Sequence, residues 1–482
     1  MKNRQLETQN LILETQKPAG RVGRIWQTIQ KSLSGEEQDY TSGSIDRAIV
    51  LLAIPMILEM MMESLFAVVD IFFVSKIGEK AVSTVGATEA VLTLVYSIGI
   101  GLSSAATAMV ARRVGEGRRD AAAKAGAQVI LIALALSVLM AVPGYFFADD
   151  VLRFMAKDPE VAAGGAAFTR IMFTCNLPIL LLWMLNGIFR GAGDASTAMR
   201  ALWIANGVNL VLDPLLIFGI GPFPEMGVTG AAVATTIGRS TGVAYQLWQL
   251  FGVGKIIQLR LSQFKPDLRT IARLLQLGAG STGQYLIASA SWVFLMWILG
   301  QIGTSVQAGY TIAIRIIVFT ILPSWGMANA AATLVGQNLG AGKPERAEKS
   351  VWRTGNWNMV FMGVVGVIYL IWAPFFIGLF AQDPEVVASG ALALRILAGG
   401  YVFYGYGMIL AQALNGAGDT ATPTLLNFIF FWIVETPLAW LLALHWDWGQ
   451  TGVYWSIVIA ESMLAVAAFW VFRRGKWKTV KV

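Results

Sequence analysis

The chain has 482 residues, of which 56% are hydrophobic and only 13% are charged. This composition excludes a soluble globular protein and indicates a membrane protein that crosses the bilayer many times. The formal net charge is +7, and the placement of the basic residues is more informative than their excess. The single cysteine, Cys175, excludes an intramolecular disulfide and any metal site built from cysteines.

Apolar segments of about 20 residues, the length that crosses a bilayer, recur along the whole chain. We predict twelve spans, at residues 48–74, 88–111, 125–147, 165–189, 197–219, 228–252, 277–300, 308–336, 352–379, 390–413, 422–445 and 451–472. The expected fold class is therefore an all-α polytopic membrane protein, with six helices in an N-lobe at 46–252 and six in a C-lobe at 277–472. Residues 1–45 are predicted as a polar N-terminal tail, 253–276 as an amphipathic linker at the membrane surface, and 473–482 as a basic C-terminal tail.

The positions of Lys and Arg predict the orientation of the chain. Of the 36 basic residues, 28 fall in the tails and connections of one side. The opposite side has four, which are Lys76, Lys80, Arg153 and Lys157. The remaining four lie within predicted spans and are Arg170, Arg239, Arg315 and Arg395. Because Lys and Arg accumulate in cytoplasmic segments, we expect both termini in the cytoplasm and the chain in the cytoplasmic (inner) membrane.

Short motifs recur at a fixed distance along the chain. The residues GEG at 115–117 return as GAG at 340–342, and RGAGD at 190–194 return as NGAGD at 415–419, each after 225 residues. Because each repeat contains an even number of spans, the two halves have the same orientation in the membrane. We expect them to be related by a pseudo-twofold axis along the membrane normal, with a central cleft, as in secondary transporters.

The first span carries three carboxylates, Glu59, Glu63 and Asp70. A charged side chain at the centre of a bilayer costs about 2.5–3.5 kcal/mol on insertion scales. At about 100° per residue, Glu63 and Asp70 lie about 40° and 20° around the helix from Glu59, so the three share one stripe. This stripe must face protein or water, and we expect Glu59 and Glu63 to line a substrate cavity. Glu59 has a second interpretation, as the partner of an intramembrane arginine such as Arg170.

Spans five and six add polar groups at a similar depth. Asn209 and Asp213 stand four residues apart on one helix face, with Pro214 next in the chain. At about 1.5 Å per residue, Asp213 lies about 24 Å and Asp70 about 33 Å along outward-running helices, and Thr235 lies about 10 Å below the outer surface. Two carboxylates, an amide and a hydroxyl suit a hard cation such as Na⁺, or the sharing of a proton. We predict a cation-coupling site for Na⁺ or H⁺, without any other cofactor, at Asp70, Asn209, Asp213 and Thr235.

The motifs resemble those of multidrug and toxic compound extrusion (MATE) transporters over about residues 45–475. The residues that carry the resemblance are Pro55, the VVDIFFVSKIG run around Asp70, the RGAGD and NGAGD turns, and the Asn-x-x-x-Asp-Pro motif of span five. The resemblance implies that Asp70, Asn209, Asp213 and Thr235 form the cation site of the N-lobe. It also implies that Pro55 is a bend point of the first span.

The sequence departs from one branch of that family in the C-lobe. Sodium-coupled NorM-like members have a glutamate in span seven and an aspartate in span ten, where this chain has Ala288 and Tyr404. A C-lobe site of that kind is therefore not expected, and the chain looks closer to the DinF-like branch.

The C-lobe still has polar residues that could face a substrate. The candidates are Gln284, Tyr404 and Glu435. Glu435 aligns with the aspartate of span five when the repeat offset falls to 222 near the end of the chain. Glu435 and Glu461 have a second interpretation, as structural partners of Arg315 or Arg239.

The expected function is a secondary active exporter of amphiphilic, mostly cationic drugs and other organic solutes, in antiport with Na⁺ or H⁺ by alternating access.

One alternative keeps the fold and changes the cargo to a lipid-linked glycan or lipid, although only four basic residues lie within spans to bind a pyrophosphate. An intramembrane enzyme is a second alternative, and no HExxH or GxSxG motif in a span supports it. A channel would need a selectivity filter, which nothing in the sequence resembles. Topology and anionic membrane lipid account for the basic loops, so no nucleic-acid partner is expected, and we expect a monomer.

Overall fold

The computed structural model describes residues 21–36, 38–155, 159–252 and 256–482, and every regular element among these residues is helical. The α-helices are α2 (Arg21–Ser34), α3 (Ile45–Ser75), α4 (Glu79–Gly115), α5 (Arg119–Met155), α6 (Pro159–Thr174), α7 (Leu177–Ala192), α8 (Ala195–Phe218), α9 (Val228–Phe251), α10 (Leu268–Ile302), α11 (Thr304–Gly340), α12 (Pro344–Gly378), α13 (Pro384–Gly399), α14 (Tyr401–Ala417), α15 (Ala421–Asn427), α16 (Thr436–Trp440) and α17 (Gly449–Arg473). Two short 3-10 helices and two π-helical segments complete the set, namely η1 (Leu261–Phe264), η4 (Lys476–Thr479), η2 (Phe428–Glu435) and η3 (Leu441–His445).

The expected all-α fold class with twelve spans is confirmed. Within the described residues, nine helical stretches are each long and apolar enough to cross a membrane. Two further spans are bent pairs, α6 with α7 at 40° and α13 with α14 at 58°, and α9, with 24 residues, is the twelfth. Pro178 stands directly after the first break and Gly399-Gly400 at the second, because proline removes a helical hydrogen bond and glycine relaxes the backbone.

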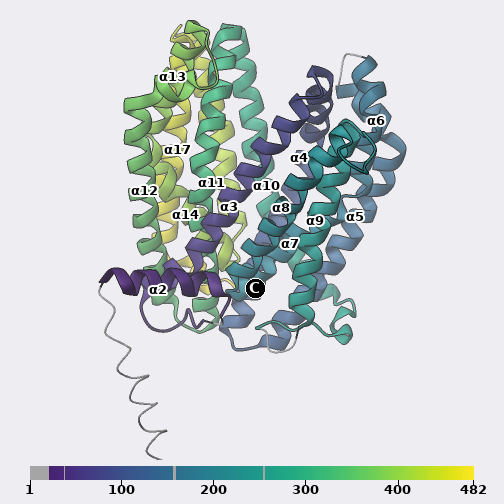
Figure 1. The fold of residues 1–482 in the computed structure, drawn as a ribbon. Coiled ribbons are helices and arrows are strands. Elements are labelled where there is room, and N and C mark those ends of the chain that lie inside the picture. Colours follow the sequence, from purple (N-terminus) through teal and green to yellow (C-terminus); the bar gives the residue numbers. More distant parts are fainter. Residues whose placement is uncertain (1–20, 37, 156–158, 253–255) are drawn as a thin grey trace, which may run out of the picture.

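The helices form two bundles that lie side by side, α4–α9 in the N-lobe and α10–α17 in the C-lobe (Figure 1). α3 runs obliquely between them. Its first half packs in one core with α11, where Met56 lies among the residues around Ala331. Its last turn packs in the N-lobe core, where Val74 lies with residues of α4 and α9. The helix that carries the acidic stripe therefore belongs to both lobes.

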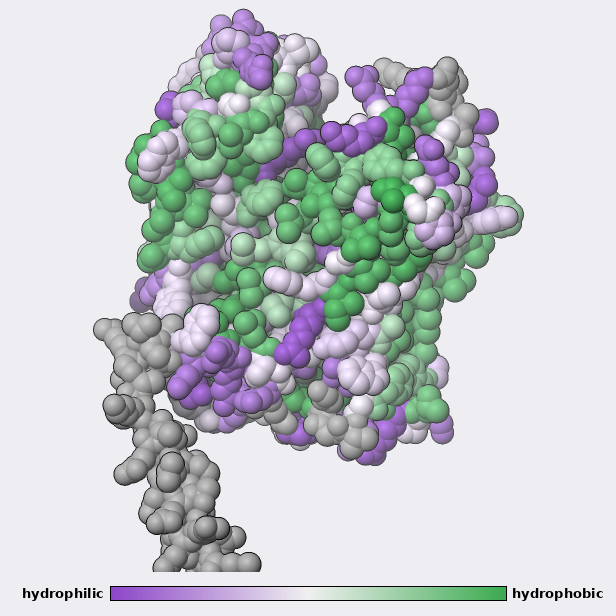
Figure 2. Space-filling model, viewed as in Figure 1, coloured by the Kyte–Doolittle hydropathy of each residue, from purple (hydrophilic) through white to green (hydrophobic). Residues whose placement is uncertain are grey.

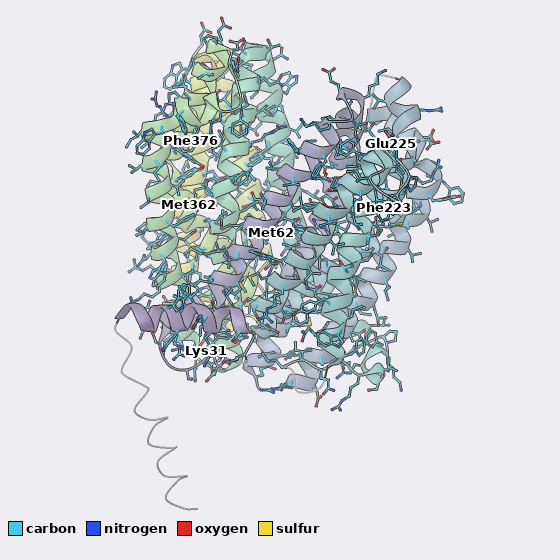
Figure 3. The ribbon with its side chains drawn as sticks, viewed as in Figure 1. Lys31, Met62, Phe223, Glu225, Met362 and Phe376 are labelled. Carbon is cyan, nitrogen blue, oxygen red and sulfur yellow. The ribbon has the colours of Figure 1, made fainter. Side chains whose placement is uncertain are left out.

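The two ends of the bundle differ. The lobes meet at the end where α2 lies, which we call the basal end, and separate at the opposite, open end, where Figure 2 shows the surface hollowed between them. In Figure 3, Lys31 of α2 marks the basal end, whereas Glu225 and Phe376 lie toward the open end. We call the space between the lobes at the open end the central cleft.

Glycines close the basal end where α4 crosses α11. A Cβ atom added at Gly115 would lie 2.0 Å from the carbonyl oxygen of Gln337, and one at Gly340 would lie 2.2 Å from that of Arg112. Gly340 follows Gly115, and Gln337 follows Arg112, by the same 225 residues. The two contacts are therefore copies of each other across the pseudo-twofold axis. The repeated GEG and GAG motifs supply these glycines, because only a residue without a side chain allows the backbones to approach so closely.

A second pair of glycines repeats the arrangement nearer the open end. A Cβ atom at Gly101 would lie 2.7 Å from the carbonyl oxygen of Gly278 on α10, and one at Gly326 would lie 2.7 Å from that of Met56 on α3. These contacts again join α4 and α11 to the opposite lobe. They show which face of α11 points toward α3.

Residues 1–20 of the predicted N-terminal tail lie outside the described residues. The described parts of both terminal segments have more structure than the polar tails that the sequence predicts. Residues 21–34 form α2 across the basal end. Tyr40 is buried and its hydroxyl donates to the carbonyl of Gly193 at 3.0 Å. Near the other terminus, Trp477 is buried and stacks on Phe472 with ring centroids 4.5 Å apart. Aromatic anchors fix these segments, which a count of charges does not reveal.

The predicted linker is shorter than 253–276. Residues 268–276 already belong to α10, which begins after its N-cap Asp267. Asp267 also forms an ion pair with Lys124 of α5 at 2.6 Å, and Gln128 of α5 donates to two linker carbonyls at 3.0 and 3.1 Å. The bond from Lys124 and the N-cap bonds hold the pKa of Asp267 at about 2. The described part of the linker is thus tied to the N-lobe.

Candidate functional site

Span five presents a buried polar group to span six. Asp213 on α8 is fully buried, and Asn209, one turn earlier, is 2% exposed. The Asn209 amide donates to the Asp213 carboxylate at 2.8 Å, and its oxygen accepts from the backbone amide of Thr235 on α9 at 3.1 Å. The i, i+4 spacing on α8 places both side chains on the face that packs against α9.

Asp70 joins this group from α3. Its charge interacts with that of Asp213, and one of its carboxylate oxygens is buried without a hydrogen-bond partner in the described part of the chain. A buried polar atom without a partner costs about 1–3 kcal/mol, a cost that a bound cation or proton would offset. Of the four residues that the sequence predicts for the cation-coupling site, Asn209, Asp213 and Thr235 are therefore in contact, and Asp70 lies within electrostatic range of Asp213.

The donor set differs from that of a transition-metal centre. Among the described residues, no group of three or more His, Cys, Asp or Glu could hold a metal ion. Carboxylate, amide and hydroxyl oxygens are instead the donors that suit a hard monovalent cation, and the two carboxylates also suit a shared proton.

Glu89 on α4 is a further carboxylate at this site, and the sequence analysis missed it. Its side chain is exposed, and its charge interacts with that of Asp70. The predicted span begins at residue 88, which places Glu89 at the membrane surface, whereas α4 begins at Glu79. Glu89 therefore lies about 15 Å along the helix. Counting charges over the whole helix instead of its apolar window would have found it.

Glu63 is linked to the site through an arginine. It pairs with Arg239 of α9 at 3.1 Å, and the Arg239 guanidinium lies 4.8 Å from the centre of the Phe66 ring. The Arg239 charge also acts on Asp70. The Glu63 side chain is 22% exposed in this pair, so it is only partly accessible to a solute, as a residue at the edge of a cavity would be.

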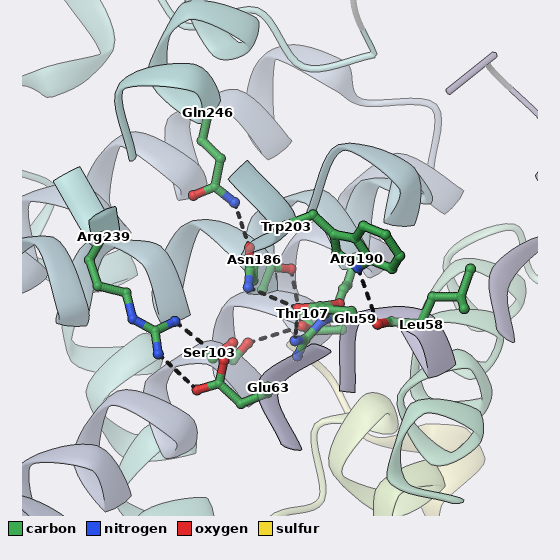
Figure 4. Close-up of polar contacts among 11 residues, drawn as sticks. Leu58, Glu59, Glu63, Ser103, Thr107, Asn186, Arg190, Trp203, Arg239 and Gln246 are labelled. Carbon is green, nitrogen blue, oxygen red and sulfur yellow. Dashed lines mark hydrogen bonds and ion pairs between the residues drawn. The ribbon is translucent and has the colours of Figure 1, made fainter. Parts of the chain in front are cut away.

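Glu59 lies in a closed polar network (Figure 4). It is fully buried, forms an ion pair with Arg190 of α7, and accepts from the Asn186 amide at 2.8 Å. Gln246 of α9 donates to Asn186. The expectation that Glu59 lines a cavity is therefore corrected, because the Arg190 charge and the Asn186 hydrogen bond hold this carboxylate inside the N-lobe.

The second interpretation of Glu59, as the partner of an intramembrane arginine, agrees with the structure, although the arginine is Arg190 and not Arg170. Arg170 instead binds Asp149 of α5 at 2.8 Å. Arg190 stands one residue beyond the predicted span 165–189, and so it was counted with the loops. The bent pair α6 and α7 carries it to the buried face of α3.

The profile of the MatE family matches two stretches of this chain, residues 55–215 and 281–441, which together make up more than half of it. This chain belongs to the MatE family. It is 26% identical over 436 residues to a Thermotoga maritima protein named "Probable multidrug resistance protein NorM", covering 90% of this chain and 93% of that one. It is 24% identical to a Shewanella oneidensis "FAD transporter", covering 90% and 95%.

A solved structure supports the same assignment. It is titled "Outward-facing conformation of a multidrug resistance MATE family transporter of the MOP superfamily", and it superposes with a TM-score of 0.85 at 25% identity. The match covers 92% of this chain and 99% of that one. This MatE-family chain is therefore a multi-pass membrane protein with the family's two-lobe helical fold.

Two of the remaining candidates, Glu435 and Gln284, lie in the interior of the C-lobe of this MatE-family chain. Glu435, at the end of η2, is 1% exposed and accepts from the Ser291 hydroxyl at 3.0 Å. Gln284 is buried and exchanges hydrogen bonds of 3.0 and 3.1 Å with Asn415. Both contacts join α10 to later helices, so the expectation that these side chains line a cavity is corrected. Among the residues that the structure describes, neither expected arginine pairs with Glu435: Arg239 pairs with Glu63 in the other lobe, and Arg315 forms no ion pair.

Tyr404 does line a cavity, although a small one. The cavity measures about 40 Å³ and its lining includes Glu461 and three further aromatic side chains, Trp292, Tyr310 and Tyr401. That volume accommodates water and is too small for a drug molecule in this conformation. Pro55 lies within α3, which continues through it as one helix, so its role as a bend point stays a prediction.

Proposed function

We propose that this protein is a secondary active exporter that moves drugs and other amphiphilic organic solutes outward in exchange for Na⁺ or H⁺. The observation that carries this proposal is the Asp70 oxygen, which is buried and has no hydrogen-bond partner among the described residues, near the bonded group of Asp213, Asn209 and Thr235. The names of the relatives and of the superposed structure support the multidrug part of the proposal.

The fold offers a way for this site to act on the cleft. A ligand shifts a conformational equilibrium only by the difference in its affinity for the two states. Asp70 stands on α3, whose first half packs with α11 of the C-lobe. A cation bound between Asp70 and Asp213 would therefore restrain a helix that contacts both lobes, and its occupancy would favour one arrangement of the lobes over the other.

Our proposals for the orientation of the chain, its lobe limits, its membrane, its oligomeric state and its branch of the family rest on the sequence. We propose that the basal end is cytoplasmic, that the lobes span 46–252 and 277–472, that the protein lies in the inner membrane as a monomer, and that it is closer to the DinF-like branch. The excess of basic residues on one side supports the orientation. The residues Ala288 and Tyr404 support the branch.

Single cysteines test the orientation. In a Cys175→Ser background, Lys76→Cys is expected to react with an impermeant maleimide from outside intact cells, whereas Arg118→Cys is expected to react only after permeabilisation. Labelling of both positions from outside would contradict the proposed topology.

Transport in proteoliposomes tests the function. The purified protein, with sodium and pH gradients imposed independently, is expected to accumulate a fluorescent organic cation under at least one gradient. Accumulation should cease when that gradient is collapsed by an ionophore. Transport that proceeds equally without either gradient would contradict a coupled exporter.

A further inference from the structure

We propose that Arg315 on α11 binds an anionic group of the exported solute, so that the preferred cargo carries both a positive and a negative charge. This inference rests on the proposed export function and narrows its substrate class. Three features of the structure carry it: the absence of a partner for Arg315 within the described part of the chain, the direction of its side chain, and the charge on the facing wall of the cleft.

Arg315 differs from four other arginines of the spanning helices. Arg170, Arg190, Arg239 and Arg395 all have a partner, whereas Arg315 forms no ion pair or hydrogen bond with any residue that the structure describes. The partners are Asp149 for Arg170, Glu59 for Arg190, Glu63 for Arg239 and the main-chain oxygen of Leu370 for Arg395. Charged residues within membrane spans are rare and face the protein interior or a water-filled cavity, where they mark solute or ion pathways. An arginine of a span without a partner among the described residues is therefore a candidate for solute binding.

The Arg315 side chain belongs to the cleft-facing side of α11. Its neighbours Ile316 and Ile317 are buried in the C-lobe core, and Arg315 itself is exposed. Gly326 follows Arg315 by eleven residues, so the two positions are about 20° apart around the helix. The Gly326 Cα packs directly against the backbone of α3. Arg315 thus projects on the side of α11 that faces the N-lobe, above the level at which the two lobes make contact.

The facing wall has the opposite charge. Glu89 on α4 is exposed and Asp70 on α3 is half-buried, and their charges interact. Glu89 lies about 15 Å from the open end of α4, and Arg315 lies about 16 Å from the open end of α11. The two helices are copies in the repeat, and position 90 on α4 corresponds to Arg315. The cleft therefore has an acidic N-lobe wall and a basic C-lobe wall at one depth.

This charge distribution identifies the class of solute. Arg presents a planar set of donors that binds a carboxylate or a phosphate through two hydrogen bonds. A solute with only a cationic group would satisfy Glu89 and leave Arg315 uncompensated. A zwitterion satisfies both walls, and the anionic group lies toward the C-lobe.

Two rhodamine dyes that differ by one ester test the proposal. Rhodamine 110 carries a cation and a carboxylate, and rhodamine 123 is its methyl ester, which retains only the cation. In proteoliposomes, Arg315→Gln is expected to raise the KM for rhodamine 110 about tenfold, as expected for loss of a charged hydrogen bond, and to change that for rhodamine 123 less than twofold. Arg315→Lys should retain part of the preference. Glu89→Gln should weaken transport of both dyes, because both are cationic.

Arg395→Gln is the matched control, since it removes another exposed arginine of a span whose partner is a main-chain oxygen, and it should not separate the two dyes. Binding of each dye to the purified protein, measured by fluorescence anisotropy, gives a readout that needs no transport. Equal changes for both dyes in Arg315→Gln, or no binding of rhodamine 110 to the wild type, would overturn the inference. Binding that depends on Arg315 without gradient-driven transport of either dye would instead overturn the proposed function.

Discussion

Replacing Asp213 with asparagine is expected to give a folded protein that no longer concentrates solute against its gradient. The substitution keeps the shape of the side chain and its contact with Asn209, but it removes one of the two carboxylates at the candidate coupling site. Loss of a charged ligand or hydrogen bond costs about 1.5–3 kcal/mol, which corresponds to about a 10- to 100-fold loss of cation affinity. The initial rate of gradient-driven uptake in proteoliposomes measures this loss.

Controls separate the loss of coupling from a loss of folding. Glu225→Gln removes the same charge from an exposed residue of the open end and should transport as the wild type does. Thr235→Val removes the hydroxyl that donates to Asn209 and should weaken gradient-driven uptake. Thr236→Val should not, because the Thr236 hydroxyl bonds within the described residues to Ala232 of its own helix. Full gradient-driven uptake by Asp213→Asn at normal expression would show that the coupling site lies elsewhere.

Replacing Arg190 with methionine is expected to destabilise the protein strongly. Glu59 is fully buried, and the substitution would leave its carboxylate without a compensating charge. Removing one partner of a buried ion pair costs about 3–5 kcal/mol. We expect a clear fall in the unfolding temperature of the purified protein, measured in detergent by size-exclusion chromatography after heating.

The double variant tests the cause. Arg190→Met combined with Glu59→Leu removes both charges and should recover most of the lost stability, because buried ion pairs can often be replaced by packed apolar side chains. Arg118→Met breaks an ion pair with Glu116 in which Arg118 is 63% exposed, and such a pair contributes about 0–1 kcal/mol. If the double variant were as unstable as Arg190→Met alone, the destabilisation would come from lost packing and not from the unpaired carboxylate.

Hydropathy and the repeat predicted the spans well, and this is why the fold class was accessible from the sequence. The same method placed Arg190 and Glu89 wrongly, because an apolar window of about 20 residues does not cover helices as long as the 37 residues of α4. Periodicity along one helix placed Asn209 beside Asp213, since that relation is local. The partner of Glu59 could not be predicted, because it depends on how the bent pair α6 and α7 packs against α3.

The two glycine contacts at the basal end have a consequence for how the lobes part. Gly115 rests on the backbone at Gln337 and Gly340 on that at Arg112, so both contacts lie on the same two helices at the pseudo-twofold axis. One cannot be broken while the other stays in van der Waals contact, because each shares its helix with the other. Opening at this end should thus be concerted, without a half-released intermediate. Such an all-or-none barrier would protect the ion gradient, since a cation could pass this end only when the whole seam has separated.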